Sequence, residues 1–372
     1  MKTFRFILLF SFLFSLGCER KNDHMILAEE NNLKEQMGRR CKTYEVFTEQ
    51  LKKDPSLQKR MDEIENFTQR YMKDPAAYRL LADGTLELPV VVNVLYNTAD
   101  QNISDKQINS QIDVLNEDFR KILGSNGWNN NPVGADTEIE FCLAQRRPDG
   151  SAFPNGELGV NRINRNTVGW TAPPHTTNYI NSTIKPYTYN NNNPTATRGW
   201  NPDKYFNIWV CKFGGDLDGV LGYAQFPDSS GLGGINTTNG NANTDGVIIG
   251  YQFFGSSDIY PNGTYEAPYD KGRTATHEIG HCFGLRHIWG DNTSCTVNTT
   301  DSNKDYCPDT PAANTAHYGC ETGSNTCTAA AGNDMVENYM DYSDDSCMNI
   351  FTQDQKTRIL AVLQNNKKTQ LV

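Results

Sequence analysis

The stretch that decides the fold runs from His277 to His287 and reads His-Glu-Ile-Gly-His-Cys-Phe-Gly-Leu-Arg-His. Residues four apart lie on one face of a helix, so His277 and His281 can present two imidazoles to one metal ion. Gly284 follows where a helix can end in the left-handed conformation, which lets the chain turn and return His287 to the same ion. Three neutral histidines with one open coordination position are typical of a catalytic zinc site.

Glu278 follows the first predicted ligand without being one itself. Its carboxylate can reach a water held at the open position, so we expect it to act as the general base. The alternative is a group of ordinary histidines on an amphipathic helix. Three of the six histidines of the chain lie in this one stretch at ligand spacing, which argues against that alternative.

A second stretch, residues 338–348, reads Asn-Tyr-Met-Asp-Tyr-Ser-Asp-Asp-Ser-Cys-Met. With the zinc motif it resembles the metzincin metallopeptidases, in which a tight turn places a methionine under the metal. Met340 matches that methionine, and Tyr342 matches the tyrosine that stabilises the oxyanion. Asp-Thr-Pro at 309–311 and Phe-Thr-Gln-Asp-Gln at 351–355 make the chain similar to the pappalysin family specifically. Alone, Met340 would be an ordinary core methionine, and Tyr342 a structural tyrosine.

The resemblance extends from about residue 85 to 365 and implies further site residues. It implies that Asp345, two residues before Cys347, lines the pocket after the scissile bond and favours Arg or Lys there by ion pairing. The alternative is a solvated loop carboxylate. It also suggests a calcium ion bound by Asp309 and Thr310, with Asp291, Asp301 and Asp305 as further oxygen donors, although a solvated acidic loop fits the same residues.

Ten cysteines in a chain with an export signal indicate a partial disulfide framework. Four of them lie in the loop-rich region after the zinc motif, where crosslinks can replace a missing core. Spacing alone leaves their pairing open. The resemblance to pappalysins favours Cys295 with Cys327, and Cys320 with Cys347. Cys142 and Cys211 lie in apolar strand-like runs and are expected to be buried thiols, while no role follows for Cys282 and Cys307.

Residues 1–17 have the pattern of a signal peptide: Lys2 and Arg5 precede an apolar run at 6–16 that is too short to span a bilayer. Gly17 and Cys18 allow lipoprotein processing, with Cys18 lipidated after cleavage, although Ser15 stands where such sites usually have Leu. The protein is therefore expected to be secreted, or a lipoprotein at the cell surface. Membrane attachment would occur only through lipidated Cys18.

Residues 18–80 are rich in Lys, Glu, Gln and Arg, and we expect a prosegment with helices near 26–37 and 43–72. A thiolate is a strong zinc ligand, so Cys41 can fill the open position and hold the enzyme latent. This arrangement resembles that of bacterial pappalysins. The alternative is an incidental thiol or a disulfide partner. Release requires a cut before the first strand, for which Arg60, Arg70 and Arg79 are candidates.

The expected fold is α/β, a metzincin catalytic domain with a mixed twisted sheet and an active-site helix. We expect strands at 86–96, 137–145, 205–211, 222–227 and 246–254, and an irregular insertion at 146–203. Helices are expected at 105–121, from about 272, and after Thr352, with capping boxes Ser104/Gln107 and Thr352/Gln355. The catalytic part divides into an N-terminal subdomain, 81–287, and a loop-rich, disulfide-bonded C-terminal subdomain, 288–372.

The 372-residue chain has 37% hydrophobic and 21% charged residues, which fits a globular protein, and its net charge of −10 argues against nucleic-acid partners. Partners are expected to be protein or peptide substrates. The sequence thus predicts a zinc endopeptidase made as a zymogen. A thermolysin-type protease with a distant Glu ligand is disfavoured by His287 and Met340. The alternative outside enzymes is a catalytically silent surface-binding protein that keeps the fold.

Overall fold

The computed structural model describes residues 40–73, 85–147, 150–153, 158–188, 200, 202, 204–226, 242–297 and 305–365. The predicted signal peptide, Cys18 and the helix expected at 26–37 lie outside these residues. No helix in the described ranges has the length and apolar character needed to cross a membrane.

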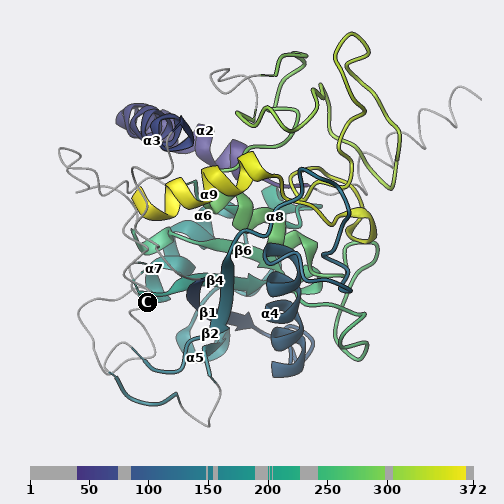
Figure 1. The fold of residues 1–372 in the computed structure, drawn as a ribbon. Coiled ribbons are helices and arrows are strands. Elements are labelled where there is room, and N and C mark those ends of the chain that lie inside the picture. The colour runs from purple at the N-terminus through teal and green to yellow at the C-terminus, as the bar shows by residue number, and fades with distance from the viewer. Residues whose placement is uncertain are drawn as a thin grey trace, which may run out of the picture. The chain divides into compact units, whose positions relative to one another are not determined.

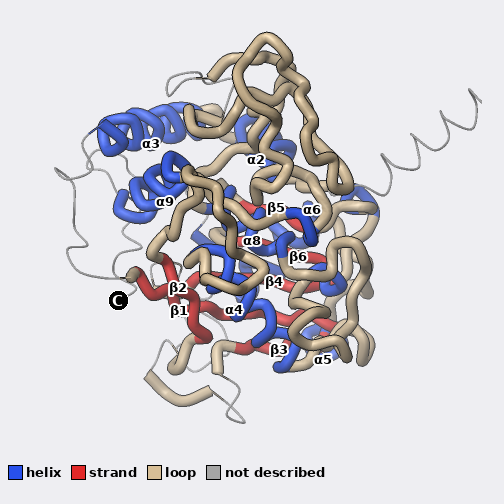
Figure 2. The backbone as a smooth tube through the Cα atoms, turned by 45° about the vertical axis from the view of Figure 1, so that its right-hand side comes forward, coloured by secondary structure: helices blue, strands red, loops and turns tan. Residues whose placement is uncertain are grey.

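A six-stranded sheet forms the centre of the molecule, with strand order β2-β1-β4-β6-β5 and β3 also paired to β1 (Figures 1 and 2). The strands are β1 (Leu86–Tyr96), β2 (Ile139–Leu143), β3 (Val160–Asn164), β4 (Phe206–Cys211), β5 (Gly222–Ala224) and β6 (Val247–Gly250). All pairs are parallel except β5 with β6, which is antiparallel. The predicted mixed sheet is confirmed.

The strand β3 was not expected from the sequence. The long strand β1 pairs with β2 along its first half and with β3 along its second half. Residues 160–164 read Val-Asn-Arg-Ile-Asn and give little strand pattern, so the region was expected to be irregular. It also holds the short helices α5 (Arg165–Val168), α6 (Thr177–Tyr179) and α7 (Lys185–Thr188), with a π-helical turn at Ile180–Ile184.

Two helices, α4 (Asp105–Phe119) and α8 (Arg273–Cys282), pack together on the sheet and share its largest apolar core. Ser104 caps α4 by accepting a hydrogen bond from the Gln107 amide. The Gln107 side chain instead binds the carbonyl oxygens of Phe254 and Thr264, so only half of the expected capping box forms. The box at α9 (Gln353–Asn365) is complete between Thr352 and Gln355.

The described residues between His287 and α9 have little regular structure. Two disulfides, Cys295–Cys327 and Cys320–Cys347, crosslink this region in the pairing implied by the resemblance. Five further cysteines form no disulfide: Cys41, Cys142, Cys211, Cys282 and Cys307. Crosslinks stabilise a segment with little regular structure, because they restrict the unfolded chain.

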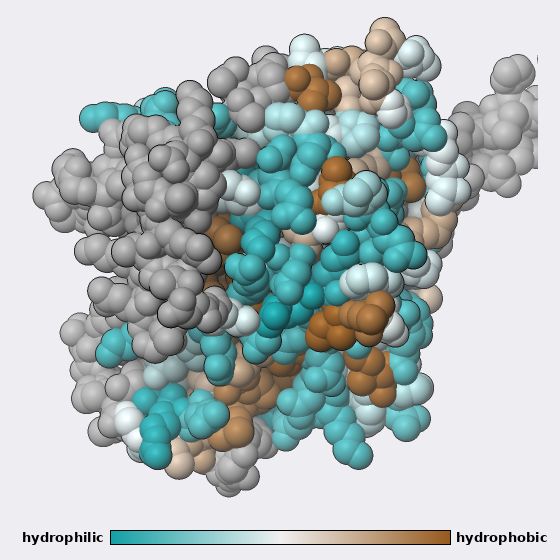
Figure 3. All heavy atoms as spheres, viewed as in Figure 1, coloured by the Kyte–Doolittle hydropathy of each residue, from teal (hydrophilic) through white to brown (hydrophobic). Residues whose placement is uncertain are grey.

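The N-terminal segment, by which we mean residues 40–73, contains α2 (Thr43–Lys53) and α3 (Ser56–Lys73). Figures 1 and 2 show α3 lying beside α9. Phe47, Leu57 and Phe226 form a small apolar cluster between this segment and the end of β5. The described residues on the face seen in Figure 3 are mostly hydrophilic, with scattered apolar patches.

Candidate active site

The zinc motif forms the helix α8 and the turn that follows it. His277 and His281 lie one turn apart on α8. Gly284 has a φ of +89°, and the hydrogen bonds from the Leu285 amide to the Gly280 carbonyl (2.9 Å) and from the Gly284 amide to the His281 carbonyl (2.9 Å) end the helix in a Schellman motif. This turn brings His287 back beside the helix, as the sequence predicts.

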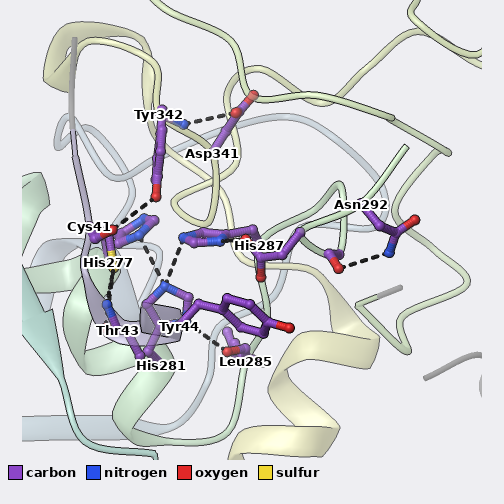
Figure 4. Close-up of polar contacts among 12 residues, drawn as sticks. Cys41, Thr43, Tyr44, His277, His281, Leu285, His287, Asn292, Asp341 and Tyr342 are labelled. Atoms are coloured by element: carbon purple, nitrogen blue, oxygen red, sulfur yellow. Dashed lines mark hydrogen bonds and ion pairs between the residues drawn. The ribbon is translucent and has the colours of Figure 1, made fainter. Parts of the chain in front are cut away.

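The three imidazoles converge through their Nε2 atoms (Figure 4). Nε2 of His281 lies 3.2 Å from that of His277 and 3.0 Å from that of His287. Burial, and then the neighbouring His287, hold the pKa of His281 well below its ordinary value, so the ring is neutral. Neutral imidazoles that converge at this spacing fit the ligand set of a tetrahedral zinc ion.

Each Nδ1 atom has a partner that fixes its ring. His277 binds the Tyr339 carbonyl at 2.7 Å, His281 the Leu285 carbonyl at 2.9 Å, and His287 the Oδ1 of Asp291 at 2.5 Å. Acceptors at Nδ1 leave the proton there and the lone pair on Nε2, which is the form that binds a metal. The donor chemistry therefore fits zinc on all three residues.

Cys41 completes this group. Its Sγ and the three histidine nitrogens all lie within 4.8 Å of one another. The thiol also lies 3.2 Å from Oε2 of Glu278, and the Thr43 hydroxyl donates to the same oxygen at 3.0 Å. Burial, and then the charge of Glu278, raise the pKa of the Cys41 thiol in the metal-free chain. Cys41 thus occupies the side of the cluster that the histidines leave open.

The edge strand β5 holds the N-terminal segment by backbone hydrogen bonds. The Leu221 amide donates to the Arg40 carbonyl at 2.9 Å, and the Lys42 amide to the Gly222 carbonyl at 3.3 Å. The Ala224 amide donates to the Thr43 hydroxyl at 2.7 Å. The segment therefore lies parallel to β5 and pairs with it through one β-bridge, between Cys41 and Gly222, in the manner of an extended peptide at a sheet edge.

Met340 and Tyr342 lie where the sequence predicts, next to the histidines. Met340 is fully buried, with its sulfur against Gly280 of α8. The ring of Tyr342 packs 5.0 Å from that of His287, and its hydroxyl donates to the Cys41 carbonyl at 3.3 Å (Figure 4). The turn thus packs against the zinc helix through Met340 and places the Tyr342 hydroxyl beside Cys41.

Comparisons with known proteins identify this arrangement. A family model described as pregnancy-associated plasma protein-A, a peptidase family, matches residues 189–364. The structure of a promirolysin mutant from Tannerella forsythia is 36% identical with a TM-score of 0.66, covering 87% of this chain and 94% of that one. The chain belongs to the pappalysin family of metzincin zinc metallopeptidases.

Further similar proteins agree with this assignment. Mature mirolysin from Tannerella forsythia, solved with a cleaved peptide, is 38% identical with a TM-score of 0.60, covering 78% of this chain and 96% of that one. An extracellular metalloprotease of Colletotrichum graminicola is 42% identical over 139 residues, 37% of this chain and 44% of that protein. An extracellular metalloprotease of Neurospora crassa is 38% identical over 156 residues, which are 42% of this chain and 47% of that protein. The match thus spans less than half of these curated relatives.

Asp345 lies at the start of the pappalysin zinc helix. Its Oδ2 accepts hydrogen bonds from the amides of Lys271 (2.9 Å) and Arg273 (3.2 Å), and its side chain is buried. An anionic acceptor at a helix N-terminus satisfies unpaired amides and favours the helix dipole. The predicted contact of Asp345 with substrate stays a prediction.

The residues predicted for calcium bind protein groups. Oδ2 of Asp309 accepts from the Asp354 amide, and Thr310 donates to the Cys307 carbonyl. Asp291 instead orients His287, and Asp301 lies outside the described residues. Within the described ranges the zinc group is the one cluster of potential metal ligands, so calcium is not supported.

Sequence reasoning missed several residues that shape the site. The Thr43 hydroxyl hydrogen-bonds both Glu278 and the Ala224 amide of β5. Its position two residues after Cys41 is the only sequence feature that could have suggested this role. Asp291 orients His287, a role that its i+4 spacing from that ligand could have suggested. His317 binds Asp341, the residue between Met340 and Tyr342, at 2.7 Å. No local pattern pointed to that pair.

Proposed function

We propose that the protein is an exported zinc endopeptidase, made in a latent form, that cleaves peptide bonds on the amino side of Arg or Lys. The observation that carries the proposal is the position of Cys41 against the three imidazoles and Glu278. Membership of the pappalysin family supports the peptidase activity. The names of the curated relatives, extracellular metalloproteases, support export.

The chemistry divides between Glu278 and Tyr342. His277, His281 and His287 would hold a zinc ion, which would supply a Lewis acid for the scissile carbonyl and the attacking water. Glu278, whose carboxylate lies 3.2 Å from the Cys41 thiol beside the imidazoles, takes the proton of the attacking water and passes it to the leaving nitrogen. The hydroxyl of Tyr342, which in this structure donates to the Cys41 carbonyl, donates to the oxyanion that forms from the substrate carbonyl.

The N-terminal segment blocks each of these parts. Cys41 occupies the open side of the histidines, and Thr43 and Cys41 both hydrogen-bond Glu278. Arg40 and Lys42 use the β5 edge, where an extended substrate would pair. Removal of the segment would therefore free the metal position, the base and the sheet edge together. Residues 18–80 are proposed as the whole prosegment, with Cys18 as an optional lipid anchor.

The preference for Arg or Lys rests on Asp345. Its carboxylate lies buried at the start of α8, one turn before His277, so a cationic side chain that reaches it would form a strongly favoured ion pair. The same residue fixes the amides of Lys271 and Arg273. Its charge would thus serve both the helix and the pocket.

The test compares wild type with Cys41→Ala, each incubated with casein with and without a chelator. We expect Cys41→Ala to be active at once, and wild type only after its N-terminal segment is cut. Cys142→Ala, which removes a free thiol far from the histidines in β2, should remain latent. A Cys41→Ala protein as latent as wild type would refute the thiol as the latency ligand. Absence of casein cleavage by every form would favour a silent binding protein.

A further inference from the structure

Two arginines lie beneath the N-terminal segment, next to the turn that joins His281 to His287. Arg358 of α9 is 3% exposed. Its Nη1 and Nη2 donate to Oε1 and Oε2 of Glu65 on α3, at 3.0 and 2.9 Å, and Nη2 also donates to the Gly284 carbonyl at 3.3 Å. Arg358 thus binds both carboxylate oxygens of a residue in the N-terminal segment, and does so next to the turn that carries His287.

The rest of this site is cationic and aromatic. The guanidinium of Arg358 lies 4.7 Å from the Tyr306 ring, and its Nε has no partner. Arg286 lies 5.2 Å over the Phe226 ring and forms no ion pair with any residue in the described ranges. Burial raises the pKa of Glu65, but the charge and hydrogen bonds of Arg358, then the hydrogen bond from Gln69 and last the charge of Arg286, lower it overall. Among the described residues, the carboxylates that line this site are Asp62 and Glu65, both on α3, so loss of α3 would leave the two guanidinium groups with no carboxylate in the lining.

A cavity of about 220 Å³ remains between the two arginines and the helices that cover them. One wall is formed by Phe226, Gly284, Arg286, Tyr306 and Arg358, and the other by residues of α2 and α3. Loss of α2 and α3 would remove that second wall. The cavity would then become an open groove with two guanidinium groups on its floor.

The groove adjoins the path of a bound peptide. The Phe226 ring is 5.5 Å from that of His281, and Phe226 follows the edge strand β5 by two residues. Gly284 and Arg286 belong to the turn between two zinc ligands. An extended peptide advances about 3.3 Å per residue, so a residue a few positions from the scissile bond would reach this groove.

We propose that Arg358 and Arg286 form a carboxylate-binding subsite for an Asp or Glu side chain of the substrate, filled by Glu65 while the chain is latent. The planar guanidinium of Arg358 binds both oxygens of a carboxylate, a geometry that Lys cannot reproduce. Once Glu65 is removed, Arg358 has lost the carboxylate that binds its two Nη atoms, and a carboxylate of the substrate takes that place. The proposal rests on the proposed function, since it needs removal of the N-terminal segment.

The experiment uses enzyme whose N-terminal segment has been removed by autolysis, or by trypsin if the chain does not cut itself. Fluorogenic peptides carry one Arg after the scissile bond and a single Glu or Gln moved through the other positions. We expect Glu to exceed Gln in kcat/KM by about tenfold at one position, because a charge-assisted pair replaces a neutral one. The ratio should fall toward one in 1 M salt.

Variants connect the preference to the two arginines. Arg358→Gln should reduce the Glu-to-Gln ratio to about one, and Arg358→Lys should keep only part of it. Arg286→Gln, at a half-buried position, tests the same groove without burying an unpaired charge. Arg120→Gln is the matched control, because Arg120 pairs with Asp136 and Glu140 and lines no part of the groove. It should leave the ratio unchanged.

The outcomes separate this subsite from the proposed function. Cleavage at Arg with equal rates for Glu and Gln at every position overturns the subsite alone, as does a Glu preference that survives in both Arg358→Gln and Arg286→Gln. If no peptide is cut, the proposed function fails. The subsite is then judged by fluorescence polarisation on metal-stripped protein: tighter binding of a Glu peptide than of its Gln counterpart supports it, and equal binding refutes it.

Discussion

Gly280, in the last turn of the zinc helix, lies so close to Met340 that a Cβ on it would come within 2.5 Å of the methionine sulfur. The helix and the turn beneath it therefore approach through a position that has no room for a side chain. The same glycine carbonyl accepts the hydrogen bond that ends the helix. One residue thus determines both the distance to Met340 and the return of the chain toward His287.

Gly280→Ala should therefore destabilise the protein, although the same change in an exposed helix stabilises by about 1 kcal/mol. Overpacking against Met340 should cost about 1–3 kcal/mol and lower the melting temperature. Thermal unfolding of an inactive Glu278→Gln background measures this without self-cleavage. Met340→Ala frees the space beside position 280. Gly280→Ala should therefore lower the free energy of unfolding less in a Met340→Ala background than in the parent protein. Additive effects of the two changes would contradict the contact.

Asp291→Asn should weaken zinc binding by about 10- to 100-fold, because the carboxylate orients His287 and raises its basicity. Competition with a coloured zinc chelator measures the affinity of the metal. Asp258→Asn removes a surface carboxylate that pairs with Lys271 and should not change it. An unchanged zinc affinity in Asp291→Asn would show that the hydrogen bond to His287 contributes nothing to the site.

Features that depend on near neighbours in sequence were predictable. The zinc helix, its glycine turn and the Thr352/Gln355 cap involve residues within a few positions of each other, and the structure contains all three. The cap at Ser104 shows the limit of such local rules. Gln107 fits the pattern, yet its side chain binds Phe254, which lies 147 residues later. A long-range contact thus outweighed a local one.

Long-range pairs account for what the sequence did not predict. Thr43 and Glu278 are 235 residues apart, and Glu65 and Arg358 are 293 apart. Neither pair has a spacing that marks it, because the fold alone brings the residues together. The strand β3 was missed for a similar reason, since its few polar residues become a strand only beside β1.

Tyr342→Phe should lower kcat by about 10²- to 10³-fold and leave KM nearly unchanged, because the hydroxyl acts on charge that develops after binding. Burial raises the pKa of Tyr342 well above its ordinary value, so the phenol stays a donor at neutral pH. Steady-state kinetics on a fluorogenic peptide measure both constants. Tyr318→Phe, a neighbour whose ring lies 6.1 Å away, is the control. Equal kcat in wild type and Tyr342→Phe would remove this tyrosine from catalysis.

Asp345→Asn should reduce the preference for Arg or Lys over Leu after the scissile bond by about tenfold, because it removes the charge and keeps the shape. Mass spectrometry of a digested peptide library measures the preference. The zinc content of the variant, measured in parallel, shows whether α8 still forms at its start. Unchanged cleavage sites with normal zinc content would show that Asp345 does not contact substrate and acts only at the start of α8.

His317 lies buried between two buried carboxylates, 2.7 Å from Oδ2 of Asp341 and 2.9 Å from Oδ2 of Asp334. Burial disfavours the charged ring, but the hydrogen bonds and charges of Asp341 and Asp334 outweigh it. The pKa of His317 is therefore raised above its ordinary value of 6.5. Asp341 also accepts the amides of His317 and Tyr342, so the contact between His317 and Asp341 holds the turn that carries Met340.

A group whose pKa is higher in the folded than in the unfolded chain stabilises fully below the unfolded value, and this contribution is lost as pH rises through the folded value. His317→Gln should therefore cost about 3–5 kcal/mol at pH 6, where it leaves buried carboxylates without a cation, and clearly less at pH 9. Urea unfolding in the Glu278→Gln background measures the difference at each pH. His175→Gln is the control, because burial lowers the pKa of His175 to about 4 and its ring is neutral throughout this range. If the cost of His317→Gln is the same at pH 6 and pH 9, the ring is not the cation that holds the turn.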